Sequence, residues 1–373
     1  MLPTSKSRSL KASSPVILTC EPGWEAALAD ELQRVFPDPR PARAAAGWVV
    51  GEFSDGEPNR APCVALCAQC LPNAQPIRAS SISEWSRAVG ERMIDGLAGH
   101  AGPWRLHVFG VYHDSGALRP RRCQLIRDKI GSLLQKKQRR LLRSLTAGDG
   151  PWLRGEALVQ VGLPMPDTGF LSICDADLRF RLRRMVAPFC GGIAGIAADR
   201  RAPSRAFAKL IEAELRLGRR IEAGQTCVDL GSSPGSWAYV ALERGARVLA
   251  VDRSPLRADL MAHPALAFVR GDAFGYRPAE RVDWLLSDVI APAERIIELL
   301  QTWVAERWCR RFCVTIKFRG TSDYAILEPL KSWLAAADVE FILRRLTNNK
   351  NEITAIGELP DDLADCRIEF PEN

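Results

Sequence analysis

From residue 203 onward, the chain alternates short apolar runs with longer segments of helical periodicity. The short runs are rich in Val, Ile and Leu and are bounded by turn residues, which is the pattern of buried strands. The expected strands are 226–230, 247–251, 267–269, 282–287, 312–317, 339–343 and 352–356. Alternating strands and helices predict an α/β domain with a doubly wound, mostly parallel, seven-stranded sheet. In such a sheet the ligand lies at the carboxyl ends of the strands.

The first half of the chain has a looser pattern. Strands are expected at 16–19 and 47–53, separated by an amphipathic helix at 24–36 and a proline-rich loop at 37–46. Further strands are expected at 104–112, 157–163 and 170–174. We therefore predict two α+β modules ahead of the sheet domain. The predicted division is a disordered arm at 1–14, a small N-terminal module at 15–75, a second module at 76–190 and the sheet domain at 191–373.

A long basic helix is predicted over residues 118–144. Between Arg119 and Arg143 it holds ten Lys or Arg residues and one acid, Asp128. The apolar residues at 125, 126, 130, 133 and 134 share one face, so that face should pack inward and leave a strongly positive face outside. Such a face favours contact with nucleic-acid phosphates, although a solvated surface is the common alternative. The candidate contacts are Arg119, Arg121, Arg122, Lys136, Lys137, Arg139 and Arg140.

The composition is that of an ordinary globular protein of two or three domains, with 373 residues, of which 47% are hydrophobic and 25% charged. No apolar run approaches the about 20 residues needed to cross a bilayer, and no apolar signal segment follows the polar N-terminus. A net charge of +7 is compatible with an RNA partner. We expect a cytoplasmic protein without a membrane contact. The sequence leaves the oligomeric state open and slightly favours a monomer.

Eleven cysteines are spread irregularly over the chain, and without a secretion signal they are expected to be reduced. The tightest group, Cys63, Cys67 and Cys70, could hold a metal ion, but no second ligand group lies nearby. Its surroundings are typical of a helix of small residues, so buried thiols are the preferred interpretation. The four histidines show no ligand spacing, and no metal is expected.

The first strand of the sheet domain leads into a glycine-containing turn. Its last residues, 227–231, read CVDLG, and SSPGSW follows at 232–237 before a helix. The turn has only Gly231 and Gly235, so it lacks the dinucleotide pattern GxGxxG and favours S-adenosylmethionine over NAD. An ordinary strand-to-helix turn is the alternative. The candidate cofactor residues of the turn are Gly231, Ser233, Pro234, Gly235, Ser236 and Trp237, with 233–235 framing the methionine end.

Acids stand at or just after the next three strand ends. Asp252 ends the second strand, 23 residues after Asp229, where an acid accepts hydrogen bonds from ribose hydroxyls. Asp272 follows the third strand, and its carboxylate is expected to accept a hydrogen bond from the exocyclic amine of adenine. Asp288 follows the fourth strand and should serve both the cofactor and the reacting groups.

Two lysines and one more acid complete this edge. Lys209 lies in a helix before the first strand, Lys317 ends the fifth strand, and Glu352 enters the last. The order and placement of these three residues and Asp288 resemble the Lys-Asp-Lys-Glu tetrad that characterises the FtsJ-like class of ribose 2′-O-methyltransferases. Within the class the chain is similar to the RlmM-like 23S ribosomal RNA cytidine 2′-O-methyltransferases. That likeness rests on APSR before the first lysine, a tryptophan pair at 303 and 308, and CEPGWEAALADEL near the N-terminus.

The resemblance implies a Rossmann-like methyltransferase domain that uses S-adenosylmethionine, preceded by a THUMP-like RNA-binding domain at 76–190. It also implies that Lys209, Asp288, Lys317 and Glu352 are catalytic, with Lys317 as our choice for the base. The sequence departs from the family at Ser236, where a glycine is usual, and at Ala206, where a serine is common. Open alternatives are another structured RNA such as transfer RNA as the substrate, and a non-catalytic module that binds S-adenosylmethionine and RNA.

Overall fold

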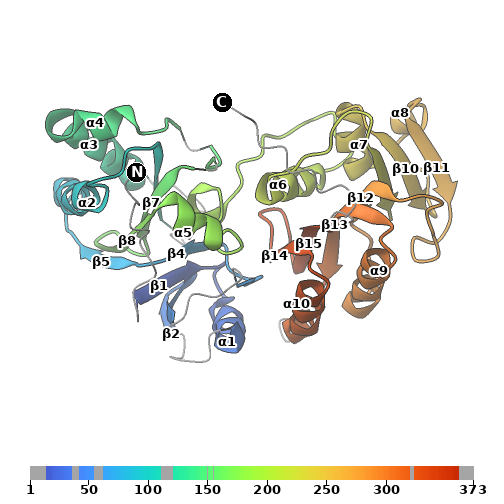
Figure 1. Cartoon of the computed structure of the whole chain (residues 1–373), viewed down its shortest axis with the longest axis horizontal. Helices are drawn as coiled ribbons and strands as arrows, with labels where there is room; N and C mark the ends of the chain where they lie inside the picture. Colours follow the sequence, from blue (N-terminus) through green and yellow to red (C-terminus); the bar gives the residue numbers. More distant parts are fainter. Residues whose placement is uncertain are drawn as a thin grey trace, which may run out of the picture. The chain divides into compact units, whose positions relative to one another are not determined.

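The computed structural model describes residues 14–35, 42–53, 62–110, 121–148, 150–153, 155–319 and 323–360. The chain divides into two compact units, Met1–Gly195 and Ile196–Asn373, which run from blue to green and from yellow to red in Figure 1. The predicted disordered arm lies outside the described residues except for Ser14, which begins the first strand. Arg119, one of the candidate RNA contacts, also lies outside them.

The first sheet of the N-terminal unit is antiparallel, in the order β2 (Ala42–Ala45), β3 (Trp48–Phe53), β1 (Ser14–Thr19) and β4 (Gln69–Leu71). Helix α1 (Glu25–Val35) contacts β2 and β3. The predicted strands 16–19 and 47–53 and the helix between them are confirmed, except at residue 36, which is outside the described ranges.

Two predictions for this sheet are wrong. The segment expected as a loop holds strand β2, and the segment around Cys63 and Cys67 is a turn leading into β4 rather than a helix. The buried carboxylate of Glu31 accepts hydrogen bonds from Ala65 N at 2.7 Å and Leu66 N at 2.9 Å, and these bonds hold the turn. The cysteine side chains of this segment are buried, as predicted.

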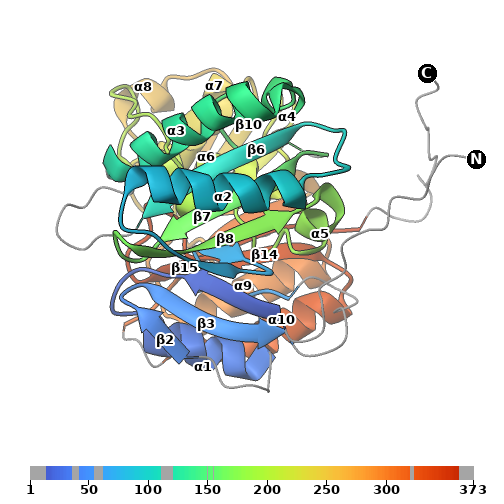
Figure 2. The same cartoon turned by 90° about the vertical axis from the view of Figure 1, so that its left-hand side faces the viewer.

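The second sheet of this unit has the order β5 (Gln75–Arg78), β8 (Thr168–Cys174), β7 (Ala157–Leu163) and β6 (Trp104–Gly110). Only β6 and β7 run parallel. Helices α2 (Ile82–Gly96) and α3 (Arg121–Lys137) lie side by side over one face of this sheet (Figure 2). The two sheets share apolar contacts, since Trp48 stacks on Phe109 with ring centroids 5.9 Å apart. The unit ends with α5 (Ala176–Arg181) and the 3-10 turn η1 (Cys190–Gly192).

The basic helix is interrupted. It ends at Lys137 and resumes as α4 (Arg139–Arg143), because Gln138 leaves helical geometry with φ −146° and ψ 64°. Its buried face consists of Cys123, Ile126, Ile130 and Leu134, so the expected inward face is largely confirmed. Leu125 is the exception, with 43% of its surface exposed, because it lies one residue, or about 100°, away from that stripe.

The C-terminal unit is the predicted seven-stranded sheet. Its order is β11 (Leu266–Arg270), β10 (Arg247–Asp252), β9 (Thr226–Leu230), β12 (Val282–Ser287), β13 (Cys309–Lys317), β15 (Glu352–Glu358) and β14 (Glu340–Arg344). All pairs are parallel except those of β15. The remaining elements are α6 (Phe207–Leu217), α7 (Ser236–Glu243), α8 (Ala258–Met261), α9 (Ala293–Ala305), η2 (Asp323–Ile326) and α10 (Leu327–Ala336).

Helices cover both faces of this sheet, with α6, α7 and α8 on one side and α9 and α10 on the other (Figure 1). The strand order reverses between β9 and β12, so the crevice at their carboxyl ends is the expected ligand site. None of the described helices combines the length and apolar character needed to cross a membrane.

Candidate active site

The turn after β9 depends on its two glycines. Gly231 has φ +72°, and a Cβ added there would lie 2.7 Å from Cβ of Val289. Gly235 has φ +106°, and a Cβ there would lie 2.5 Å from Cδ1 of Leu260. Any other residue would be strained at both positions, so the glycines let the turn pack closely against neighbouring segments.

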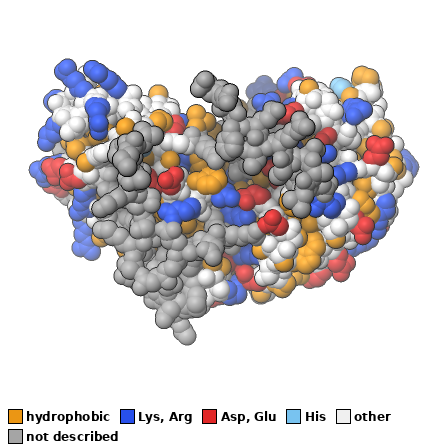
Figure 3. All heavy atoms as spheres, in the orientation of Figure 1, with side chains coloured by type: hydrophobic (Ala, Val, Ile, Leu, Met, Phe, Trp, Pro, Cys, Tyr) orange, Lys and Arg blue, Asp and Glu red, His pale blue; other side chains and the backbone are white. Residues whose placement is uncertain are grey.

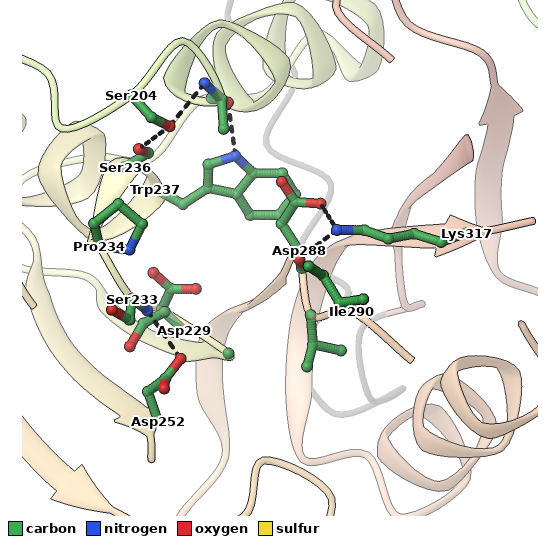
Figure 4. A pocket seen from close by; sticks show the side chains of 14 residues that line it. Ser204, Asp229, Ser233, Pro234, Ser236, Trp237, Asp252, Asp288, Ile290 and Lys317 are labelled. Carbon is green, nitrogen blue, oxygen red and sulfur yellow. Dashed lines mark hydrogen bonds and ion pairs between the residues drawn. The ribbon is translucent and has the colours of Figure 1, made fainter. Parts of the chain in front are cut away.

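The turn borders a cavity of about 400 Å³ at the carboxyl ends of β9, β10 and β12 (Figure 4). Seven of the predicted cofactor residues line it: Gly231, Ser233, Pro234, Ser236, Trp237, Asp252 and Asp288. The Asp252 carboxylate is fixed, because it accepts hydrogen bonds from Ser233 N at 3.0 Å and Ser254 N at 2.8 Å. Asp229, recognised from sequence as an acid near a strand end but not assigned to the cofactor, also lines the cavity. The sequence had not singled out the other lining residues Ser204, Ser232, Val289 and Ile290.

Two predicted cofactor residues do not line this cavity. Gly235 lies behind the turn, against Leu260. Asp272 is 43% exposed and lies 3.3 Å from the Arg295 guanidinium, because it follows β11, the edge strand of the sheet. Their roles toward a cofactor stay predictions.

The cavity wall includes a buried polar atom that fits a ligand. Ser232 is 5% exposed, and its Oγ has no hydrogen-bond partner among the residues that the structure describes. Beside it, Asp229 is 2% exposed, and its Oδ2 accepts a hydrogen bond from Ala238 N at 3.0 Å. Burial raises the pKa of Asp229 to about 8, despite that hydrogen bond. A cofactor with polar groups would supply the partners that these side chains lack.

The raised pKa of Asp229 predicts a pH-dependent stability of the cofactor-free protein. The folded state holds the Asp229 proton more tightly than the unfolded chain, because an aspartate in an unfolded chain has a pKa of about 3.9. The free energy of unfolding should therefore fall as pH rises from about 4 to about 8. Asp229→Asn removes this titrating group, so the free energy of unfolding of the variant should not fall in the same way. Relative to wild type, it should increase from about pH 4 to about pH 8 by at least about 1.4 kcal/mol, the equivalent of one pKa unit. Urea unfolding at pH 5 and pH 8 measures this difference; a constant difference would contradict it.

The two positions that depart from the family join the turn to the segment before α6. Ser236 Oγ lies 2.7 Å from Ser204 Oγ, and Trp237 Nε1 donates to the Ala206 carbonyl oxygen at 2.9 Å. Ser204 Oγ also accepts from Ala206 N at 3.2 Å. These hydrogen bonds hold residues 204–206 against the turn; Ser236 contributes its side chain, whereas Ala206 contributes only its backbone.

The structure brings the four residues of the predicted tetrad together. Lys209 Nζ lies 3.1 Å from Asp288 Oδ2 and 2.6 Å from Glu352 Oε1. Lys317 Nζ lies 3.1 Å from Asp288 Oδ1 and 3.9 Å from Glu352 Oε2. It also donates to the Asp288 carbonyl oxygen at 2.8 Å. The antiparallel pairing of β13 and β15 sets Lys317 directly opposite Glu352.

The two lysines differ in their surroundings. Lys209 is 8% exposed at its side chain, whereas Lys317 is 23% exposed and lines the cavity. Burial alone would lower the pKa of Lys209, but the charge of Asp288 and the hydrogen bond to Glu352 outweigh it and raise the pKa above its usual value. Lys209 therefore stays charged at neutral pH, and Lys317 is the lysine that a substrate in the cavity can reach.

The three cysteines at 63, 67 and 70 lie in the N-terminal unit, where a metal site was the alternative to buried thiols. Within the described ranges, no group of three or more His, Cys, Asp or Glu side chains is arranged to hold a metal ion.

Comparison with known proteins identifies the second unit. A family model described as FtsJ-like methyltransferase matches residues 202–351. The ribosomal RNA large subunit methyltransferase M of Alkalilimnicola ehrlichii is 28% identical over 92% of this chain and 94% of its own length. The protein of the same name from Xanthomonas oryzae pv. oryzae is 34% identical over 58% of this chain and 67% of its own length.

A solved structure, that of TrmN from Thermus thermophilus, matches 93% of this chain and 99% of its own, with a TM-score of 0.32 and 16% sequence identity. A likeness this low says nothing about function. The matching family model and the names of the relatives confirm the coarser prediction, an RNA methyltransferase that uses S-adenosylmethionine. With its similarity to two methyltransferases M along most of their length, the chain belongs to the ribosomal RNA large subunit methyltransferase M family.

Proposed function

We propose that the protein methylates a ribose 2′-hydroxyl of large-subunit ribosomal RNA, with a cytidine of 23S RNA as the target and the cytoplasm as its place of action. The single observation that supports it most is the meeting of Lys209, Asp288, Lys317 and Glu352 beside the cavity. The relatives are named for ribosomal RNA of the large subunit, which supports the choice of substrate.

The chemistry requires removal of a proton from a weakly acidic hydroxyl. S-adenosylmethionine supplies a methyl group on a positively charged sulfur, and the sulfur keeps the bonding electron pair when the methyl group leaves. In the proposed step, the 2′-oxygen forms its bond to the methyl carbon while Lys317, as the neutral amine, accepts the hydroxyl proton. Asp288 orients the amine, and charged Lys209 holds Asp288 from the other side.

The cofactor would be held by the chain's own polar groups. Asp252 would accept hydrogen bonds from the ribose hydroxyls. Asp229 and Ser232 line the cavity and are buried, and their side chains would pair with polar groups of the methionine end.

Two alternatives have less support. A non-catalytic module would have no need for four converging charged side chains, two of which are less than one-tenth exposed. Transfer RNA or another structured RNA is chemically equivalent as a substrate, and only the names of the relatives favour ribosomal RNA. The predicted THUMP-like module at 76–190 fits a structured RNA and stays a prediction.

Helices α3 and α4 carry the proposed contact with the RNA backbone. Figure 3 shows Lys and Arg side chains gathered over these helices. Arg121, Lys136, Lys137, Arg139 and Arg140 are exposed, whereas Arg122 is half-buried and donates to the Ser80 carbonyl oxygen at 3.2 Å. Arg139 and Arg140 each donate one hydrogen bond to a backbone carbonyl oxygen, but all five cations are exposed to solvent. Contacts of these side chains with phosphates would give binding that depends on salt and not on sequence.

Charge reversal on this surface should weaken RNA binding. Replacing Lys136, Lys137, Arg139 and Arg140 with Glu should lower the affinity for RNA at least about tenfold and flatten the dependence of affinity on salt, because each lost phosphate contact lowers the slope by about 0.9. Filter binding at several salt concentrations measures both quantities. The affinity for S-adenosylhomocysteine should not change. Equal RNA affinity and an equal slope would contradict the assignment.

The proposed function is tested by mapping the product. Total RNA from cells that lack the protein is incubated with the purified protein and labelled S-adenosylmethionine, and 2′-O-methyl groups are located by alkaline hydrolysis and sequencing. We expect one new 2′-O-methyl group in the large-subunit RNA. Label on a base, or label confined to transfer RNA, would contradict the proposal.

A further inference from the structure

The most exposed large apolar side chain among those described belongs to the rim of the active-site cavity. Ile290 is 88% exposed, although it follows the buried strand β12 by only three residues. It lines the cavity together with Asp288 and Lys317. Figure 4 shows it beside these two residues, across the cavity from Pro234 and Asp252.

The segment that carries Ile290 is held in place. Val289 packs against Gly231 so closely that a Cβ on the glycine would lie 2.7 Å from the valine Cβ. The carbonyl oxygen of Asp288 accepts a hydrogen bond from Lys317 Nζ at 2.8 Å. With the two residues before it held in this way, the Ile290 side chain projects into solvent from an anchored backbone, and its exposure is a feature of the fold.

A large apolar side chain in this position could contact the base of a nucleotide substrate. A ribose hydroxyl can reach Lys317 inside a cavity only if its nucleotide leaves the stack of its neighbours. The unstacked base then loses apolar contact, which protein side chains commonly replace. Ile290 lies on the side of the cavity where the hydroxyl must arrive, whereas the cofactor residues of the turn lie on the opposite side.

We propose that Ile290 contacts the face of the target nucleobase and positions the unstacked nucleotide for methylation. The inference rests on the proposed function and adds a substrate contact to it. An apolar face discriminates little between bases, so Ile290 would hold the nucleotide while other contacts select it.

The test separates RNA binding from cofactor binding. Ile290→Ala and Ile290→Ser are compared with wild type, using 23S RNA transcribed in vitro and saturating S-adenosylmethionine. We expect KM for the RNA to rise roughly tenfold, with the dissociation constant of S-adenosylhomocysteine within about twofold of wild type. Ile290→Phe offers a larger flat surface and should keep KM at or below the wild-type value. Leu215→Ala is the matched control, because Leu215 is 40% exposed and lies outside the cavity.

Each other outcome overturns the inference. An unchanged KM in the Ala and Ser variants shows that the base does not touch Ile290. A weaker affinity for S-adenosylhomocysteine with an unchanged KM shows that Ile290 contacts the cofactor instead. Neither result affects the proposed function, which stands as long as wild type methylates this RNA and Ile290→Ala places the methyl group on the same nucleotide. If wild type leaves the RNA unmodified, the proposed function fails, and the inference that depends on it fails too.

Discussion

Lys317→Ala is expected to lower the rate of methyl transfer by roughly 10³-fold, the usual contribution of a positioned base. Lys317 is the lysine that lines the cavity, and its amine is oriented by Asp288 at 3.1 Å and by the Asp288 carbonyl oxygen at 2.8 Å. The reaction is measured as a single turnover with labelled S-adenosylmethionine. Because the side chain is partly exposed, the affinity for S-adenosylhomocysteine and the thermal midpoint should change little.

Two further variants distinguish a base from a positive charge. Lys317→Arg supplies a permanent positive charge that does not release its proton near neutral pH, so it should be as inactive as the alanine variant. Lys331→Ala removes a lysine that is 9% exposed at its side chain and paired with Glu328 in α10, away from the cavity, and should keep full activity. High activity of Lys317→Arg would contradict the role of Lys317 as the base and would show that it acts only through a positive charge.

The sheet domain could be predicted from sequence because local and global signals agree in it. Each strand is an apolar run bounded by turn residues, and Asp252, Asp288, Lys317 and Glu352 stand at or beside strand ends. Residues at the carboxyl ends of parallel strands must share one edge, so their proximity follows from the topology. The antiparallel β15 brings Glu352 to this edge by its first residue instead.

The contacts that sequence reasoning missed depend on exact distances between separate segments. Asp229 was recognised as an acid near a strand end, but nothing in the sequence shows that burial raises its pKa to about 8. The pair Ser204 and Ser236 joins segments 32 residues apart, and no periodic pattern signals it. Ile290 resembles any other residue of an apolar run in the sequence, and only its exposure in the fold distinguishes it.

The errors in the N-terminal unit have a different cause. The segment around Cys67 has the composition of a small-residue helix, but two hydrogen bonds to the buried Glu31 carboxylate hold its backbone in a turn. The strand at Ala42–Ala45 follows a proline-rich stretch that resembles a loop, and pairing with β3 determines its structure. In both cases a contact with another segment outweighs the local preference.

Lys209→Met is expected to reduce the free energy of unfolding by about 3–5 kcal/mol, in addition to abolishing methyl transfer. Lys209 lies between Asp288 and Glu352, and its side chain and that of Glu352 are only 8% and 9% exposed. Removing this cation takes away the buried ion pair of Glu352 and leaves the two carboxylates with only the more exposed Lys317, which lies 3.1 Å from Asp288 and 3.9 Å from Glu352. The loss is measured by urea unfolding at pH 7.5, where wild-type Lys209 is charged because its pKa lies above the usual value.

A double variant separates the structural role of Lys209 from its role in the reaction. Lys209→Met combined with Glu352→Gln removes the buried carboxylate together with its partner, so most of the lost stability should return. Methyl transfer should stay abolished, because Asp288 would lose Lys209 and Lys317 would lose Glu352 as charged partners, leaving only their own pair. If the single variant is as stable as wild type, or if the double variant recovers activity along with stability, Lys209 does not act as the charge that holds the two carboxylates in place for the reaction.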